Sequence, residues 1–162
     1  MIRVAEYANM LNRELEIIHQ QTEGLADQDT LIQPPHGGNC MAWVLGHIAD
    51  GMTTILTNLG GALPEGLPAL TRYQRGSEPI LGAEPGLVLL DKLLESIDKL
   101  NQSIQSQLAG MTEADFDEEI NLFGSQKARR GWGAFFMFFH HTYHIGQLEV
   151  LRNLAGKTEK II

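Results

Sequence analysis

The sequence predicts an all-α fold, a four-helix bundle with a long crossover between its second and third helices. Two observations lead to this prediction: four segments repeat apolar residues at helical spacing, and no window shows the sustained alternation of an internal strand. With 162 residues and 43% hydrophobic side chains, the chain has the size and composition of a single domain over residues 1–162. Amphipathic helices of this length bury their apolar faces most simply against one another.

The first two helices are expected over residues 2–24 and 39–59. In the first segment, apolar residues recur at intervals of three and four and share one face: Val4, Ala8, Leu11, Leu15 and Ile18. The second segment starts at Asn39, a residue type that caps helix N-termini, and stops at the glycine pair 60–61. Its apolar face comprises Val44, Ile48, Met52, Ile55 and Leu59.

The third and fourth helices are expected over residues 86–109 and 130–155. The third has the clearest pattern, a heptad-like stripe that we expect to be buried: Leu87, Leu90, Leu94, Ile97, Ile104 and Leu108. The fourth has Met137, Leu148 and Leu151 on one face.

The connection between the second and third helices, residues 61–85, is long and contains four prolines. About 25 extended residues outreach a helix of roughly 30 Å, so this crossover can span the bundle and let the two helices run parallel. Before the fourth helix, an acidic run that follows Thr112 predicts a short helix, and residues 120–123 predict an extended piece.

The composition narrows the classes of partner. Lys and Arg number 12 against 20 Asp and Glu, and the formal net charge of −8 argues against nucleic acid and anionic lipid. The longest apolar run, residues 135–139, is far shorter than the roughly 20 residues of a membrane helix, and no targeting segment is visible, so we expect a cytoplasmic protein. The single cysteine, Cys40, excludes a disulfide framework and is interpreted as a small core residue.

Two histidines share the apolar face of the fourth helix. At about 100° per residue, His140 and His144 fall within about 40° of each other, in the stripe that contains Met137 and Leu148. Imidazoles at i and i+4 on one helix face can bind one metal ion. The alternative is a pair of core histidines, each of which would need a buried hydrogen-bond partner. The pair therefore favours a metal site.

His47 is the candidate third ligand. It borders the apolar face of the second helix, where its ring can reach inward beside an opening to solvent. Trp43, one turn earlier, can form a wall of the site, and Gly51, one turn later, leaves room beside it. His141, three residues before His144 and toward the edge of the stripe, is interpreted as a neighbour of the ligands, with a ligand role as the alternative.

These motifs resemble those of a known family. The run His140-His-Thr-Tyr-His144-Ile-Gly-Gln147 is similar to the His-x-x-x-His-x-Gly-Gln signature of the DinB-like (YfiT-like) superfamily, and the Trp-containing turn before His47 is similar to its second-helix motif. The resemblance implies a four-helix bundle with a long crossover, a divalent metal ion held by His47, His140 and His144, and a homodimer. We expect Gly146 to allow close helix packing and Gln147 to hydrogen-bond near the site.

A site of three neutral imidazoles predicts an open metal centre, because the ion keeps its positive charge and at least one position for water or substrate. The resemblance implies a metal-dependent transferase of the thiol (S-transferase) type or a hydrolase, acting on a small molecule, with a low-molecular-weight thiol as a candidate partner. The alternative is a non-catalytic metal-binding protein, either stress-related or an interaction module. The candidate ions are zinc and nickel, followed by iron and manganese.

Four other polar side chains have open roles. Asp50, three residues after His47, is either an acceptor or general base beside the site or a solvated carboxylate, and we favour the second interpretation. Arg72, Tyr73 and Arg75 in the long connection are candidates to bind an anionic group of a substrate.

Overall fold

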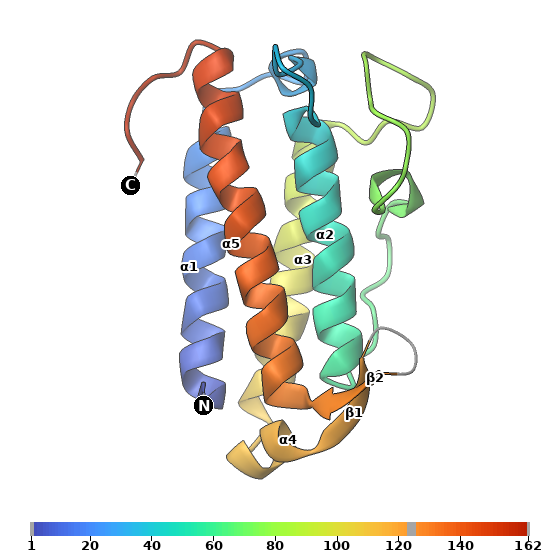
Figure 1. The fold of residues 1–162 in the computed structure, drawn as a ribbon, viewed down its shortest axis with the longest axis vertical. Helices are drawn as coiled ribbons and strands as arrows, with labels where there is room; N and C mark the ends of the chain where they lie inside the picture. Colours follow the sequence, from blue (N-terminus) through green and yellow to red (C-terminus); the bar gives the residue numbers. More distant parts are fainter. Residues whose placement is uncertain (1, 123–125, 162) are drawn as a thin grey trace.

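The computed structural model describes residues 2–122 and 126–161. Four long helices lie side by side in a bundle (Figure 1): α1 (Val4–Thr22), α2 (Met41–Asn58), α3 (Leu90–Ala109) and α5 (Arg130–Leu154). The predicted all-α fold and its four helices are confirmed, and each observed helix lies within the range expected from the sequence. The second helix starts slightly later than expected, because Cys40 rather than Asn39 takes the extended N-cap conformation.

The helices are arranged in a ring of order α1, α3, α2, α5. The helix α5 packs against α1 and α2, and α3 packs against the same two helices. Figure 1 shows α1 and α5 running upward and α2 and α3 running downward. The predicted parallel arrangement of the second and third helices is therefore confirmed.

The crossover that makes this arrangement possible is a strap, defined here as residues 59–89, which climbs beside α2 from its end to the start of α3 (Figure 1). The strap is packed rather than loose, because Leu70, Tyr73 and Ile80 are buried in the core. Arg72 links separate parts of the strap, because its guanidinium donates to the Glu84 carboxylate and to two backbone carbonyls of the strap.

The buried face of α3 differs from the expected stripe. The buried apolar side chains of this helix are Leu90, Leu93, Ile97, Leu100, Ile104 and Leu108. Leu87 precedes the helix and Leu94 lies at the edge of the core, and both are only partly buried. The expectation for these two residues was wrong, because α3 packs on both α1 and α2 and so buries the face centred between them.

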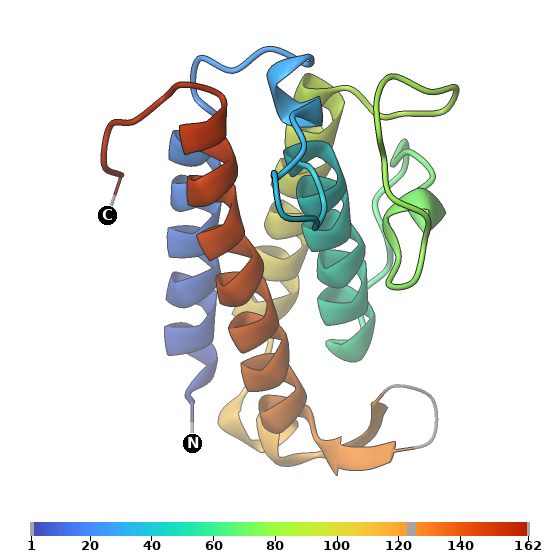
Figure 2. The same ribbon diagram turned by 45° about the horizontal axis from the view of Figure 1, so that its top comes forward.

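The lower end of the bundle is closed by a short helix and a hairpin (Figure 2). The predicted acidic helix is α4 (Glu113–Asp117), capped by Thr112 and Asp115. The strand β1 (Glu119–Leu122) pairs antiparallel with β2 (Gln126–Arg129). The extended piece expected over 120–123 falls in β1 except for residue 123, which lies outside the described residues, and β2 was not expected.

Arg130, the first residue of α5, joins these parts. Its Nε donates to the Asn58 carbonyl at the end of α2 (3.0 Å), and its Nη1 donates to the Asp115 carbonyl and to the Glu118 carboxylate of the segment around α4. Among the described residues, no helix is both long and apolar enough to cross a membrane.

Candidate metal centre

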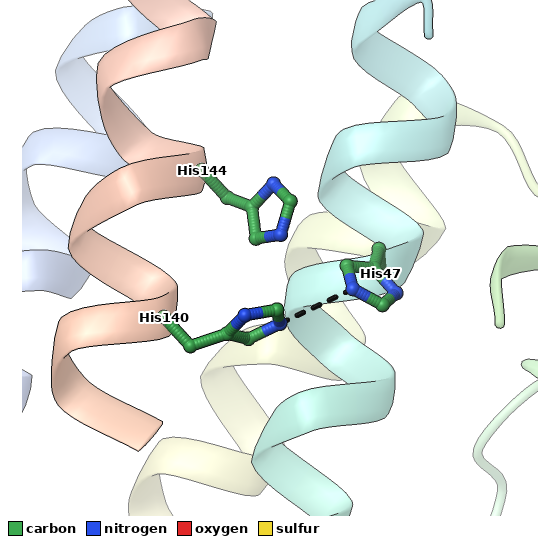
Figure 3. A group of neighbouring side chains, drawn as sticks. All are labelled: His47, His140 and His144. Atoms are coloured by element: carbon green, nitrogen blue, oxygen red, sulfur yellow. Dashed lines mark hydrogen bonds between the residues drawn. The ribbon is translucent and has the colours of Figure 1, made fainter. Parts of the chain in front are cut away.

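Three histidines converge between α2 and α5. His47 comes from α2, and His140 and His144 come from successive turns of α5. One ring nitrogen from each lies within 4.8 Å of the other two, and Figure 3 shows the two rings of α5 directed toward α2. The i, i+4 spacing places both α5 rings on one side, and the α2–α5 packing brings His47 opposite them. The predicted convergence of these three side chains is therefore present in the structure.

The ring of His47 is held with its Nε2 toward the cluster. Its Nδ1 lies 2.8 Å from the backbone carbonyl of Tyr73. A carbonyl can only accept, so Nδ1 carries the hydrogen and Nε2 has a free lone pair. The Trp43 ring stacks on one face of the His47 ring, with the ring centroids 4.7 Å apart and the planes at 21°. Trp43 thus forms a wall of the site, as expected. The Trp43 indole in turn donates to the Ser77 hydroxyl of the strap (2.9 Å).

His144 is oriented in the same way from its own helix. Its Nδ1 lies 2.7 Å from the side-chain oxygen of Gln147, one turn further along α5. The amide oxygen accepts, so Nδ1 again carries the hydrogen and Nε2 is left as the ligand atom. The expected hydrogen bond of Gln147 near the site is thus present.

His140 completes the group from a half-buried position. Its Nε2 lies 3.2 Å from the Nε2 of His47 (Figure 3). Burial, together with the neighbouring imidazoles, lowers the pKa of His140 to about 4. Burial also lowers the pKa of His144, although the hydrogen bond to Gln147 opposes this effect. Both rings are therefore neutral at pH 7, which is the protonation state that binds a metal.

The donor set fits a divalent ion. Two imidazole nitrogens that each bind one ion at about 2.1 Å with tetrahedral geometry lie about 3.4 Å apart. The separation of 3.2 Å between the nitrogens of His47 and His140 is close to this value. Two bare lone pairs at such a distance repel each other unless a proton or a cation lies between them. A cation meets this requirement for all three nitrogens together.

His141 lies outside this cluster. It is 2% exposed, in the middle of the core, with its Nδ1 3.8 Å from the Glu14 carboxylate of α1. The expectation that it sits near the edge of the apolar stripe was wrong, because the buried face of α5 is centred on His141 and Ile145 rather than on His144. Gly51 leaves room for His141 and not for His47, since a Cβ at Gly51 would overlap the His141 ring.

Glu14 is a buried polar residue that the sequence reasoning missed. Its carboxylate accepts from the Thr142 hydroxyl (3.0 Å) as well as facing His141, so it joins α1 to α5 behind the cluster. A glutamate on the apolar side of an amphipathic helix was the available signal.

Gly46 is another residue that the sequence reasoning missed, and it lies against Tyr73, which was expected as a candidate to bind an anion. The ring of Tyr73 is fully buried against Gly46, where any Cβ would overlap it. The Tyr73 hydroxyl accepts from the Val88 N–H (2.9 Å). This hydrogen bond joins two parts of the strap that are 15 residues apart in sequence. Tyr73 and Arg72 therefore belong to the packing of the strap rather than to a surface that binds an anion. A glycine next to a candidate ligand inside a helix was the signal for this close contact.

The remaining candidates lie away from the three nitrogens. Asp50 is half-buried and accepts from the Gln74 side chain (3.2 Å), and it is not part of the metal-sized group. Cys40 is fully buried, as expected of a core residue. Gly146 is exposed, and a Cβ there would meet nothing within 4 Å, so the close packing expected at this residue does not occur within the chain.

Comparisons with known proteins agree with the fold. The family model described as the DinB superfamily matches residues 10–148, a range that includes all three histidines. A crystal structure of a DinB-like protein from Bacillus cereus ATCC 10987 is 19% identical, with a TM-score of 0.77 over 99% of this chain and 97% of that one. A conserved protein from Enterococcus faecalis is 14% identical, with a TM-score of 0.68 over 96% of this chain and 98% of that one. No curated protein matches the sequence.

Proposed function

Because this chain belongs to the DinB superfamily, we propose that it binds one divalent metal ion through His47, His140 and His144 and uses that ion to activate a small molecule. The observation that carries the proposal is the convergence of three ring nitrogens within 4.8 Å of one another. Two of these nitrogens have their protonation state set by a hydrogen bond on the far side of the ring.

The chemistry follows from the neutrality of the ligands. Three neutral imidazoles leave the charge of a divalent ion uncompensated and leave coordination positions open, so the ion lowers the pKa of a bound water or thiol. The protein supplies the lone pairs of three imidazole rings. Because His140 and His144 are neutral at pH 7, a metal ion does not have to displace a proton from either ring. Trp43 shields one face of the His47 ring from water.

The proposed activity is a metal-dependent transfer to a low-molecular-weight thiol, or the hydrolysis of a small molecule. In the transfer, the thiol sulfur forms a bond to an electrophilic carbon, the leaving group departs from that carbon with the bonding pair, and the thiol proton passes to solvent. In the hydrolysis, water replaces the thiol. Among the described residues, no Asp or Glu joins the three histidines in the group of candidate ligand atoms.

The first experiment measures the metal content of protein purified without a metal-affinity tag. We expect about one zinc or nickel ion per chain by elemental analysis. His144→Ala should remove the metal and keep the helical content, because the apolar core does not depend on this ring. His36→Ala is the matched control, since His36 lies exposed in a loop and should leave the metal content unchanged. Equal metal content in the His144 and His36 variants would overturn the site.

The second experiment separates the reactions. Metal-loaded protein is incubated with electrophilic substrates and a panel of small thiols, and with a panel of esters and amides in the absence of thiol. Thiol consumption that requires His144 supports the transferase, and thiol-independent hydrolysis supports the hydrolase. A protein that retains its metal but accelerates neither reaction is the non-catalytic metal-binding protein.

A further inference from the structure

The two residues between the α5 ligands both contact one carboxylate of α1. His141 and Thr142 follow His140 in the chain and precede His144. The Thr142 hydroxyl donates to Oε1 of Glu14 (3.0 Å), and Nδ1 of His141 lies 3.8 Å from Oε2 of the same carboxylate. A single side chain of α1 thus engages the turn of α5 that separates the two ligands.

The other end of the His141 ring lies against α2. A Cβ at Gly51 would be 2.4 Å from Nε2 of His141, so the ring occupies the space that any larger residue at this position would need. The helix α5 packs against both α1 and α2 and lies between them in Figure 1. The His141 ring therefore reaches from Glu14 on one neighbour to Gly51 on the other. A rotation of α5 about its axis would press the ring against one of them and draw it away from the other.

Small rotations of α5 matter for the metal centre. The ring nitrogens of a helical histidine lie roughly 6 Å from the helix axis, so a rotation of about 10° moves them by about 1 Å. Metal–nitrogen distances vary by only about 0.2 Å around their usual values. Because His140 and His144 belong to the same helix, one rotation would displace both rings relative to His47.

The buried pair of Glu14 and His141 opposes folding. Glu14 is 6% exposed and His141 is 2% exposed. Among the described residues, Nε2 of His141 has no hydrogen-bond partner. Burial of a carboxylate and of an unpartnered ring nitrogen costs free energy, and apolar side chains of similar size at such positions often leave a protein equally stable or more stable. The positions that these two polar side chains impose on α5 explain their presence better than stability does.

We propose that Glu14 and His141 are positioning residues of the metal centre, a role that rests on the metal binding proposed above. They fix the rotation of α5 between α1 and α2, and this rotation directs the two ligands of α5 toward the ligand of α2. Neither residue belongs to the group of three ligand nitrogens, so both act through the helix rather than on the ion.

Metal affinity and stability are measured separately in an apolar double variant, Glu14→Leu with His141→Leu, using zinc. We expect the metal-free variant to unfold at the same urea concentration as the wild type or at a higher one. Its affinity for zinc should fall about 10- to 100-fold, as when other groups that orient ligand histidines are removed. Gln21→Leu is the matched control, because Gln21 is a buried polar residue of α1 seven residues after Glu14, and it should leave the affinity unchanged.

The outcomes separate this role from the metal site itself. Wild-type affinity in the double variant, or an equal loss of affinity in Gln21→Leu, would overturn the positioning role alone. A wild-type protein that binds no metal would overturn the metal site and this role with it.

Glu14→Gln distinguishes position from charge. Its amide oxygen can still accept from Thr142, so the affinity for zinc should stay close to that of the wild type. Glu14→Leu, which has no acceptor, should bind zinc more weakly. Equal losses in the two variants would overturn the role of this hydrogen bond in positioning α5.

A double-mutant cycle tests the contact with α2. Gly51→Ala places a methyl group where the His141 ring lies, so we expect a lower metal affinity and a changed visible spectrum of bound cobalt(II), which reports coordination geometry. In the His141→Ala background, the same substitution should have little further effect, because the ring that it would displace is absent. Losses that add independently would overturn the role of His141.

Discussion

Gln147 acts on the cluster through a single hydrogen bond, because its side-chain oxygen accepts from Nδ1 of His144 (2.7 Å). Gln147→Leu removes this acceptor and leaves the His144 ring free to rotate or to change tautomer. We expect metal affinity to fall about 10- to 100-fold, as when other hydrogen-bond partners of ligand histidines are removed. Competition with a coloured chelator measures the change. Gln102→Leu, an exposed glutamine on α3, should leave the affinity as it is, and an equal loss in both variants would contradict the role of Gln147.

Gly46 is needed because the Tyr73 ring occupies the space of its missing side chain. Gly46→Ala should push the ring and its carbonyl away from His47, and overpacking of this kind destabilises a protein by about 1–3 kcal/mol. Urea unfolding of the metal-free protein measures the loss. Gly82→Ala is the matched control in the same strap, because its Cβ would meet nothing within 4 Å. A Gly46→Ala protein as stable as the control would show that the strap can shift freely.

At the scale of single residues, the sequence predicted the three converging histidines because all three depend on local rules. The spacing of His140 and His144 defines one face of one helix, and the border position of His47 defines where it can reach. The hydrogen-bond partners that orient the rings are of two kinds, one near its histidine in the sequence and one far from it. Gln147 lies one turn from His144 and was expected near the site, whereas the Tyr73 carbonyl comes from a segment 26 residues away from His47, a contact that no local rule predicts.

At the scale of elements, the helix boundaries could be predicted from the sequence, but the face of α3 that is buried could not. Capping residues, glycines and apolar periodicity locate the ends of each helix from nearby residues alone. The sequence of α3 contains two overlapping stripes, one through Leu94 and one through Leu93 and Leu100. Only the positions of α1 and α2 decide which stripe is buried, and that information is not local. The strand β2 was missed for a similar reason, since four residues with two basic side chains have no apolar alternation.

The Arg130 side chain joins three elements at the lower end of the bundle. Arg130→Met keeps an unbranched apolar stem but removes the guanidinium, which leaves the carbonyls of Asn58 and Asp115 without this donor. We expect the free energy of unfolding to fall by about 1–3 kcal/mol. Amide hydrogen exchange should accelerate in α4 and β1 more than in α3. Arg75→Met, at an exposed position of the strap, is the control. Amide exchange that accelerates to the same extent in all elements of both variants would contradict the local role of Arg130.

At the scale of the whole molecule, the stability of the metal-free protein should depend on pH. Burial lowers the pKa of His140 to about 4, whereas a histidine in the unfolded chain has a pKa of about 6.5. At a pH between these two pKa values, the unfolded chain binds more protons than the folded chain, so acidification favours unfolding. Stability should therefore fall as the pH decreases from 7 toward 4. Urea unfolding of chelator-treated protein at several pH values measures the slope, and His140→Gln should flatten it. An unchanged slope in that variant would contradict this assignment.

The ring order of the helices also determines how the chain can fold. The helices α1 and α2 follow each other in sequence, but α1 packs mainly on α3 and α5, and the neighbouring pair α2 and α3 is separated by the strap. Among the long helices of the described residues, no major interface thus joins two helices connected by a short turn. The chain must therefore close a long loop before each of these interfaces can form. Refolding should therefore take milliseconds or longer, more slowly than in a simple up-and-down bundle. Stopped-flow fluorescence of the two tryptophans measures the rate, with a double-jump experiment to separate slow proline isomerisation. Completion within microseconds would mean that the long loops are already closed in the unfolded ensemble.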